Sequence, residues 1–286
     1  MSKEWITPNI DFEKAVDLSN SLSVSHDIAK LLLLRGVSNY SEAENFFRPN
    51  INQLHNPFDM KDMNLAIERI ELAIQRNERV LIYGDYDVDG TTAVSMMFDF
   101  FSKYFSFLDY YIPDRYSEGY GVSIKSIDFA KKNEFTLIIA LDCGIRAVKQ
   151  IEYANDLNID YIICDHHNPG EIIPAAKAIL NPKQLSCNYK FKELSGCGVG
   201  FKLIQAFCIK RNINSNKLTP LLDLLAISIA ADIVPIVDEN RILMFYGLQQ
   251  INRSPREGIK ALINSAKKDK EIKISDILFG IAPLIN

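Results

Sequence analysis

The sequence lacks the segments that would carry a chain to or through a membrane. Residues 1–5 are not a basic stretch followed by an apolar one, and no apolar run approaches the length of a membrane-spanning helix. The five cysteines are odd in number and include no Cys-x-x-Cys pair, which excludes a zinc site of that pattern and an obvious disulfide framework. We therefore expect a soluble, cytoplasmic protein with reduced cysteines and no membrane partner.

The chain also lacks an excess of basic residues. Its net charge of −4, from 32 Lys and Arg against 36 Asp and Glu, argues against a surface that is basic all over. A local basic track is compatible with this total, because the distribution of charge matters more than its sum. With 286 residues and 48% hydrophobic content, the chain suffices for one large domain or two modest ones.

Short apolar segments alternate with helical ones in the middle of the chain. The pattern predicts strands at 80–83, 108–112, 136–141, 160–164 and near 177–181, separated in part by helices at 91–105, 123–132 and 145–156. Such alternation is typical of an α/β fold with a doubly wound, mostly parallel sheet. We expect helical extensions on both sides, and divide the chain into a helical N-terminal segment (1–78), a sheet domain (79–240) and a helical C-terminal segment (241–286).

Three short motifs place carboxylates and histidines directly after predicted strands. They are DYDVDG at 85–90, LDCG at 141–144 and CDHH at 164–167. Ligands of a doubly wound sheet bind beyond the carboxyl ends of its strands, so the motifs are expected to share one crevice. So many acids would repel each other without divalent cations, and paired Mn²⁺ or Mg²⁺ ions in such sites act on phosphate esters. The sequence therefore predicts a metal-dependent phosphoesterase.

The first motif has a structural alternative. Asp85, Asp87 and Asp89 are predicted to lie in a turn that ends at Gly90. Such a turn could aim several carboxylates at one ion, or it could be a solvated acidic turn. An EF-hand calcium loop does not fit, because an EF-hand has Glu at its twelfth position, and the twelfth residue counted from Asp85 is Met96.

The other acidic residues and the histidines have alternatives of the same kind. His166 and His167 are half of the four histidines, and one could bind metal while the other faces substrate, with Asp165 setting the tautomer. A hydrogen-bonded histidine pair in a turn is the alternative. Asp142 is costly to bury unless paired, so a bridging metal ligand is a natural role. Asp232, in an apolar segment, is equally compatible with an acid that merely ends a helix.

Two further features could bind phosphate. Gly198 and Gly200 belong to a glycine-rich turn that opens a predicted helix near 195–210, where backbone N–H groups could approach a phosphate. Close packing between helix and strand explains these glycines equally well. Arg115 suits bidentate phosphate contact, with an ion pair to Glu118 on a surface loop as the alternative.

Taken together, these motifs resemble the DHH phosphoesterase family, named for the sequence seen here at 165–167. Within the family, the similarity is to the bacterial 5′→3′ exonucleases specific for single-stranded DNA. It extends over nearly the whole chain. Further segments that carry it are RG at 35–36, FRP at 47–49, LHNPFDMKDM at 54–63, YGDYDVDG at 83–90, IPDR at 112–115, EGYG at 118–121, GVGFK at 198–202 and ADIVP at 231–235.

The resemblance implies roles for the site residues. Two ions, Mn²⁺ or Mg²⁺, would be held by carboxylates and one imidazole, with Asp142 shared between them. The first ion would take Asp85, Asp87 and Asp142, and the second would take Asp89, Asp142, His166 and Asp232. As further catalytic residues, His167 would contact the scissile phosphate and Asp165 would support the histidine pair. Substrate contacts would come from His167, Arg115, Gly198, Gly200 and Lys202.

The resemblance also implies an activity and partners. The expected reaction is two-metal hydrolysis of phosphodiester bonds, in a 5′→3′ exonuclease that releases mononucleotides from single-stranded DNA during DNA repair and recombination. A single-strand-binding protein and a helicase are the further partners implied. The alternatives are a hydrolase of short oligonucleotides or cyclic dinucleotides, and a truncated form that is inactive or serves as a scaffold.

The sequence departs from the family pattern near its C-terminal end. Leu284 stands where the family has the arginine of its next motif, and 286 residues do not include the second cleft domain, DHHA1, or the oligonucleotide-binding fold. We expect residues 79–240 to be the DHH catalytic domain and residues 241–286 to lead to the missing DHHA1 domain.

Overall fold

The chain divides into two compact units between Gln53 and Leu54. The computed structural model describes residues 8–286, so the part of the predicted N-terminal helical segment that covers residues 1–7 lies outside the described residues. The division differs from the boundary that we expected at 78/79, because residues 54–78 belong to the larger unit. The second expected boundary, at 240/241, falls inside a helix, α10 (Asp238–Arg253).

The smaller unit contains three short helices, α1 (Phe12–Leu22), α2 (His26–Leu33) and α3 (Tyr40–Phe47), followed by a 3₁₀ turn at Ile51–Gln53. Each helix has a polar N-cap residue whose side chain accepts a backbone N–H of the first turn. These residues are Asp11, Ser25 and Asn39. The apolar faces meet in a small core of Leu18, Ala29, Leu32, Val37 and Ala43. The prediction of helices in this part of the chain is confirmed.

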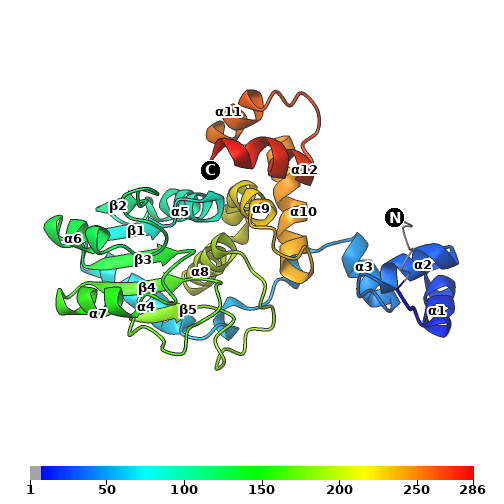
Figure 1. The fold of residues 1–286 in the computed structure, drawn as a ribbon, viewed down its shortest axis with the longest axis horizontal. Helices are drawn as coiled ribbons and strands as arrows, with labels where there is room; N and C mark the ends of the chain where they lie inside the picture. The colour runs from blue at the N-terminus through cyan, green and yellow to red at the C-terminus, as the bar shows by residue number, and fades with distance from the viewer. Residues whose placement is uncertain (1–7) are drawn as a thin grey trace, which may run out of the picture. The chain divides into compact units, whose positions relative to one another are not determined.

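A five-stranded parallel sheet forms the centre of the larger unit. The strands are β1 (Val80–Gly84), β2 (Leu108–Tyr111), β3 (Leu137–Leu141), β4 (Asp160–Cys164) and β5 (Ala178–Leu180), in the order β2-β1-β3-β4-β5. All four pairings are parallel, and the strands lie side by side in this order in Figure 1. The predicted doubly wound α/β fold is confirmed.

Helices cover both faces of the sheet. On one face, alternate strand residues such as Leu81, Ile138 and Tyr161 pack in a buried core with α6 (Ile124–Lys132) and α7 (Val148–Asp156). The other face contacts α4 (Met63–Gln75), α5 (Val88–Phe101) and α8 (Gly196–Lys210). Because β1, β3 and β4 are covered on both faces, nearly all of their residues are buried, which explains their continuous apolar sequences.

Helices follow the sheet toward the C-terminal end. They are α9 (Leu222–Ala231), α10 (Asp238–Arg253), α11 (Glu257–Ser265) and α12 (Ile274–Asp276), with a π-helical turn at Ile277–Ile281 and 3₁₀ turns at Pro57–Asp59, Ser215–Leu221 and Ala282–Leu284. Helix α9 packs against α5 and α10, and almost all of its mostly apolar residues are buried. Within residues 8–286, no helix combines the length and apolar character required for a membrane span.

Candidate metal centre

The first acidic motif is shared between a loop and a helix. Asp85 follows β1, and Asp87 is the N-cap of α5, where its carboxylate accepts the Gly90 N–H at 2.9 Å. Asp89 lies in the first turn of α5. Our prediction of one turn ending at Gly90 is wrong here, because the helix begins at Val88, three residues earlier than the predicted start at 91.

The carboxylate of Asp85 is completely buried, and its two oxygens accept hydrogen bonds from backbone groups. Oδ1 accepts the Tyr86 N–H at 2.7 Å, and Oδ2 accepts the Gly121 N–H at 2.9 Å. Burial raises the pKa of Asp85, while these two hydrogen bonds oppose the shift. In this arrangement Asp85 fixes the segment around Gly121 next to the end of β1.

Asp89 is held by the start of helix α8. Its carboxylate accepts the Gly196 N–H at 2.6 Å, the Cys197 N–H at 2.8 Å and the Ser228 hydroxyl at 2.7 Å. A helix N-terminus stabilises a negative charge, so these donors favour the ionised form. Burial nevertheless raises the pKa of Asp89, because the carboxylate has lost its hydration.

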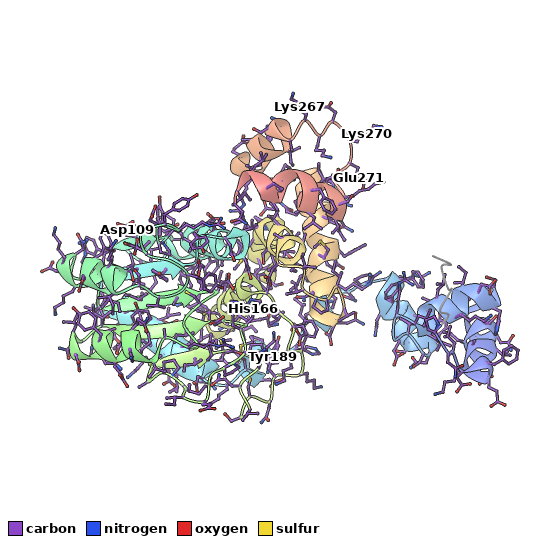
Figure 2. The ribbon with its side chains drawn as sticks, in the orientation of Figure 1. Asp109, His166, Tyr189, Lys267, Lys270 and Glu271 are labelled. Atoms are coloured by element: carbon purple, nitrogen blue, oxygen red, sulfur yellow. The ribbon has the colours of Figure 1, made fainter. Side chains whose placement is uncertain are left out.

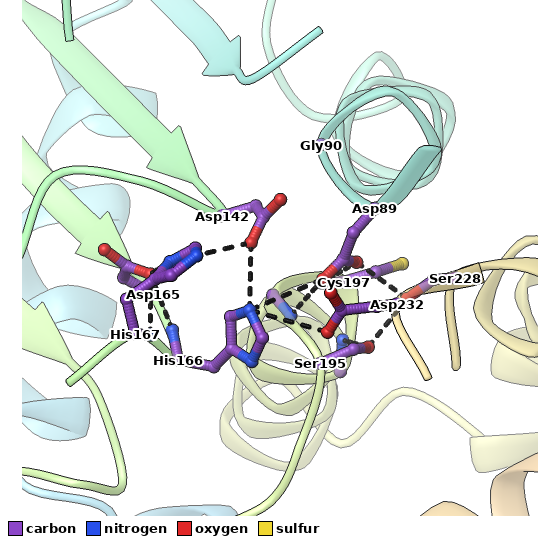
Figure 3. Close-up of polar contacts among 12 residues, drawn as sticks. Asp89, Gly90, Asp142, Asp165, His166, His167, Ser195, Cys197, Ser228 and Asp232 are labelled. Atoms are coloured by element: carbon purple, nitrogen blue, oxygen red, sulfur yellow. Dashed lines mark hydrogen bonds and ion pairs between the residues drawn. The ribbon is translucent and has the colours of Figure 1, made fainter. Parts of the chain in front are cut away.

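Three more groups converge on the side of Asp89 from different elements. Asp142 follows β3, His166 follows β4, and Asp232 is the C-cap of α9. The Nε2 atom of His166 lies 3.2 Å from Asp142 Oδ1, 3.6 Å from Asp232 Oδ2 and 3.9 Å from Asp89 Oδ2, as Figure 3 shows. The carboxyl ends of two strands and the ends of two helices therefore meet at one point, as expected for a doubly wound sheet.

Several of these converging atoms are buried without a partner. Among the described residues, Asp142 Oδ1, Asp232 Oδ2 and both ring nitrogens of His166 have no hydrogen bond. Buried polar atoms are normally satisfied, and leaving one unpaired costs about 1–3 kcal/mol. Several such atoms around one point fit a divalent cation, for which carboxylate oxygens and an imidazole are suitable ligands.

The electrostatics of the cluster also fit a divalent cation. Burial, reinforced by Asp89 and Asp87, raises the pKa of Asp142 well above its usual range. Burial and the charge of Asp89 raise the pKa of Asp232 to about 7. Burial also lowers the pKa of His166, which keeps this imidazole neutral and able to act as a ligand. A bound cation would relieve both carboxylate shifts.

Asp165 organises the two histidines. Its Oδ1 atom accepts the His166 N–H at 2.7 Å and pairs with His167 Nδ1 at 2.7 Å, and Oδ2 accepts the Ile145 N–H at 2.9 Å. Burial alone would raise the pKa of Asp165, but the contact with His167 and the hydrogen bond from the Ile145 N–H lower it. The same contact raises the pKa of His167, whose Nε2 lies 3.0 Å from the Tyr120 hydroxyl.

The structure thus assembles one of the two predicted ligand sets closely. Among the described residues, donor atoms lie within 4.8 Å of one another in two groups, one of Asp89, His166 and Asp232 and the other of Asp142, His166 and His167. Asp85 and Asp87 belong to neither group, since their carboxylates bond to backbone N–H groups. Both predicted ions stay predictions, and the donor atoms brought together belong mainly to the second of them.

The predicted substrate contact of Lys202 is wrong. This side chain is fully buried, and its Nζ donates to the Glu239 carboxylate at 2.9 Å and to the His55 carbonyl at 2.7 Å. Only the shared motif predicts this contact. In the structure Lys202 lies on α8, away from solvent, and contributes to packing.

The predicted phosphate contact of the glycines is also contradicted. The first N–H groups of α8 already bond to Asp89, and the Gly198 N–H bonds to the Ser195 hydroxyl at 3.1 Å. A Cβ atom at Gly200 would lie 3.1 Å from Leu141 Cδ2. The alternative, close packing of helix and strand, therefore accounts for Gly200, whereas a Cβ atom at Gly198 would meet Leu194 just before α8.

Arg115 stays accessible to a ligand. Its side chain is exposed, and its guanidinium lies 5.3 Å from the centre of the Tyr86 ring. The alternative ion pair with Glu118 does not form in the described structure, because Glu118 accepts hydrogen bonds from Tyr111 and Ser123 instead. The structure leaves the phosphate role of Arg115 as a prediction.

Sequence reasoning missed two serines and a tyrosine that support the centre. Ser228 donates to Asp89, and its hydroxyl lies 2.7 Å from that of Ser195, the N-cap of α8. Tyr120 contacts His167. The signal for Ser195 was present, since a serine before the glycine-rich helix is a typical N-cap. Nothing local distinguishes Ser228, which lies among apolar residues of α9.

The comparison with known protein families agrees with the geometry of this centre. Residues 79–229, more than half of the chain, match the DHH family, N-terminal domain. The chain belongs to the DHH family. The family match begins one residue before β1 and includes every residue of the centre except Asp232.

Individual relatives of this DHH protein are nucleases. It is 40% identical, over 99% of its length, to the single-stranded-DNA-specific exonuclease RecJ of Bacillus subtilis, of which the match covers 35%. A crystal structure of exonuclease RecJ bound to manganese is 27% identical, with a TM-score of 0.71, covering 81% of this chain and 57% of that one. RecJ of Thermus thermophilus in complex with Mn²⁺ shares the fold, with a TM-score of 0.79 at 23% identity over 96% of this chain and 38% of that one.

These relatives are longer than the chain described here. The matched part covers between a third and a half of the curated relatives. The similarity therefore concerns the DHH part of those proteins, and their other parts have no counterpart in the match.

Proposed function

We propose that this DHH protein hydrolyses phosphodiester bonds with two divalent ions, Mn²⁺ or Mg²⁺, and removes mononucleotides from the 5′ end of single-stranded DNA. The observation that carries the proposal is the convergence of buried, unpartnered donor atoms from Asp142, His166 and Asp232. The buried ion pair of Lys202 and Glu239, by contrast, leaves none of its charged atoms without a partner. The similarity to RecJ exonucleases supports the choice of DNA as substrate.

The ligand residues form two sets that share one member. Asp89, Asp142, His166 and Asp232 would hold one ion, and Asp85 and Asp87 would join Asp142 around the second. Bound ions of this kind lower the pKa of water and neutralise the charge that develops on a phosphoryl group. Asp142 belongs to both sets, so its loss would affect both ions.

His167 and Asp165 act beside the ions rather than on them. The Asp165 carboxylate accepts a hydrogen bond from the His167 ring, which orients the ring and favours its protonated form, since the contact raises the pKa of His167. A protonated His167 can donate a hydrogen bond to a phosphate oxygen, and its side chain is 40% exposed, so a substrate can reach it. Arg115 on the neighbouring loop would supply a second cationic contact.

The setting of the reaction is part of the same proposal. We assign the chemistry to residues 79–240, with residues 241–286 leading to a DHHA1 domain, in keeping with the greater length of the relatives. DNA repair and recombination would be the process, with a single-strand-binding protein and a helicase as partners. The five cysteines are free and buried, which favours a reducing compartment such as the cytoplasm.

A nuclease assay tests the proposal directly. The protein is incubated with Mn²⁺ and a single strand labelled at its 5′ end, and the products are separated by length. We expect labelled mononucleotide from the first time point and no product with excess chelator. A faster reaction with dinucleotides or cyclic dinucleotides would replace the exonuclease by the small-substrate hydrolase, and no hydrolysis of any diester would overturn both.

A further inference from the structure

The carboxylate of Glu118 gathers the hydrogen bonds of the loop between β2 and α6. Oε1 accepts the Asp114 N–H at 3.0 Å, Oε2 accepts the Ser123 hydroxyl at 2.5 Å, and the Tyr111 hydroxyl lies 3.0 Å from both oxygens. Tyr111 ends β2, and Ser123 is the N-cap of α6. One half-buried side chain therefore joins the end of a strand, the start of a helix and the loop between them.

The Glu118 carboxylate is an acceptor in every one of these contacts. Burial alone would raise the pKa of Glu118, but the hydrogen bonds from Ser123, Asp114 and Tyr111 lower it. The ionised form therefore suits these donors, and its hydrogen bonds are stronger than those of a neutral acceptor.

The far end of the same loop meets the metal centre. The Tyr120 hydroxyl lies 3.0 Å from His167 Nε2. The next residue, Gly121, donates its N–H to Asp85. Because Nδ1 of His167 pairs with Asp165, Nε2 is the ring nitrogen left for a phosphate. The position of Tyr120 therefore bears directly on the phosphate contact proposed above.

The backbone on either side of Tyr120 gives it little support. Gly119 has a φ of 79° and Gly121 a φ of 86°, and a Cβ atom at either position would meet nothing within 4 Å. Two glycines in open space would let Tyr120 move unless the chain is fixed beyond them. Glu118 fixes it on one side, and the bond from Gly121 to Asp85 fixes it on the other.

We propose that Glu118 is a positioning residue, which holds Tyr120 against His167 and thereby directs the ring that contacts the scissile phosphate. The proposal rests on the proposed function for the reaction itself. Its structural part, the link from Glu118 through Tyr120 to His167, is testable without turnover.

Nuclear magnetic resonance of the imidazole nitrogens tests this link in metal-free protein. The chain has four histidines, so ¹⁵N-labelled histidine gives few signals, and the signals that His167→Gln removes are those of His167. The wild type is compared with Glu118→Ala, Glu118→Gln and Tyr120→Phe. Glu42→Ala is the matched control, because Glu42 also accepts a backbone N–H and a hydroxyl, both from Ser38, but belongs to the smaller unit.

We expect Glu118→Ala to shift the His167 Nε2 signal in the same direction as Tyr120→Phe, which removes the hydroxyl itself. Glu118→Gln should restore most of the wild-type signal, since one acceptor oxygen remains and the two hydroxyls can turn to accept from the amide. Glu42→Ala should match the wild type. An unchanged His167 signal in Glu118→Ala would overturn the proposal.

Mn²⁺-dependent hydrolysis of bis(p-nitrophenyl) phosphate measures the consequence for the reaction. Glu118→Ala should lower kcat by about tenfold or more at unchanged KM, since a displaced group that acts in the transition state costs rate rather than binding. Combined with Tyr120→Phe, the two losses should not multiply, because both changes act through one contact. Losses that multiply fully would mean that Glu118 acts by another route, and would overturn the proposal.

Two further measurements keep the outcomes apart. Melting curves show whether Glu118→Ala is folded, and if it is not, Tyr111→Phe takes its place, with a smaller effect in the same direction because it removes one donor to Glu118. No hydrolysis by the wild type would contradict the proposed function, whereas the His167 signal decides the link.

Discussion

Two of the buried charged clusters in the larger unit differ in how their polar atoms are satisfied. In the metal centre, carboxylate oxygens of Asp142 and Asp232 face the ring of His166 without a hydrogen bond. In the second cluster, the charged atoms of Lys202 and Glu239 are paired with each other and with their neighbours. Figure 2 marks the two places by His166 and Tyr189.

The cluster around Lys202 is closed. Glu239 Oε1 accepts from Lys202 Nζ at 2.9 Å and from the His55 N–H at 3.0 Å, and Oε2 accepts the Tyr189 hydroxyl at 2.5 Å. Both Lys202 and Glu239 are completely shielded from solvent. The cluster connects the segment at His55, helix α8 and helix α10, so it holds the fold together and offers nothing to a ligand.

The comparison shows why burial and charge alone do not identify a functional site. Both clusters contain buried ionisable groups, and a search for such groups would return both. The balance of charge and the number of unpaired atoms distinguish the two clusters. The closed cluster pairs one cation with one anion. The metal centre gathers several carboxylates around an imidazole whose lowered pKa keeps it neutral.

The largest effect is expected from neutralising one acid in the metal centre. Asp142→Asn should abolish binding of at least one Mn²⁺ ion and lower diester hydrolysis by at least about 100-fold, since even supporting residues of metal sites cost about 10- to 100-fold. Asparagine suits the left-handed backbone of Asp142, with φ of 58°, so the fold should persist. Calorimetry with Mn²⁺ measures the ions bound.

Asp109→Asn is the matched control, because Asp109 is exposed on the outer strand β2, far from His166 in Figure 2. It should bind Mn²⁺ like the wild type. Two ions bound by Asp142→Asn with unchanged affinity would refute the assigned centre.

The same change in the closed cluster should act on stability instead. Glu239→Gln leaves Lys202 buried without its counter-charge, which we expect to lower the free energy of unfolding by about 3–5 kcal/mol. Urea unfolding measures the effect. Glu257→Gln, at an exposed position of α11, should change it by less than about 0.5 kcal/mol. If Glu239→Gln were as mild as this control, the closed cluster would not be structural.

The pH dependence of stability should have opposite signs with and without metal. The pKa of Asp232 is raised from about 4 to about 7, so the folded state binds more protons than the unfolded chain between these values. In metal-free protein this carboxyl's contribution to stability therefore falls as the pH rises from about 4 to about 7. Bound Mn²⁺ favours the ionised form and should reverse the trend.

Asp232→Asn isolates this contribution, because the pKa values of Asp89 and Asp142 shift in the same direction and that of His166 in the opposite one. Melting temperatures of both proteins are compared across this pH range with chelator. A difference that does not change with pH would contradict the raised pKa of Asp232.

The smallest predicted effect comes from a residue that supports a ligand without touching the ions. Ser228→Ala removes the hydroxyl that donates to Asp89 at 2.7 Å, and we expect Mn²⁺ affinity to fall by about tenfold while the protein remains folded. Ser102→Ala, which removes an exposed helix-terminal hydroxyl, is the control. Affinity unchanged in Ser228→Ala would mean that the α8 N–H groups alone orient Asp89.

Much of the fold could be predicted from periodicity because the sheet is simple. Continuous apolar segments follow from strands covered on both faces, and the predicted ends of β1, β3 and β4 differ from the observed ones by about a residue. The start of α5 was placed too late, since the acidic residues at 87–89 resemble a turn, whereas Asp87 caps the helix. A cap and a turn use the same residue types, so local sequence does not separate them.

The site was predictable to the extent that strand ends define it. Asp142 and His166 follow adjacent parallel strands, so their meeting depends only on topology. Asp232 reaches the site through the packing of α9 on α5, and it entered our prediction through family resemblance. Lys202 shows the limit of that resemblance, because a shared motif can serve packing as well as binding.

Gly196 brings two acids from different elements close together without a side chain of its own. A Cβ atom on Gly196 would lie 2.5 Å from both the Cβ and Oδ1 atoms of Asp142, and the N–H of the same residue bonds to Asp89. The absence of a side chain at position 196 therefore sets the distance between the two carboxylates. Any other residue at position 196 would push helix α8 outward, and the centre would widen although every ligand was still present.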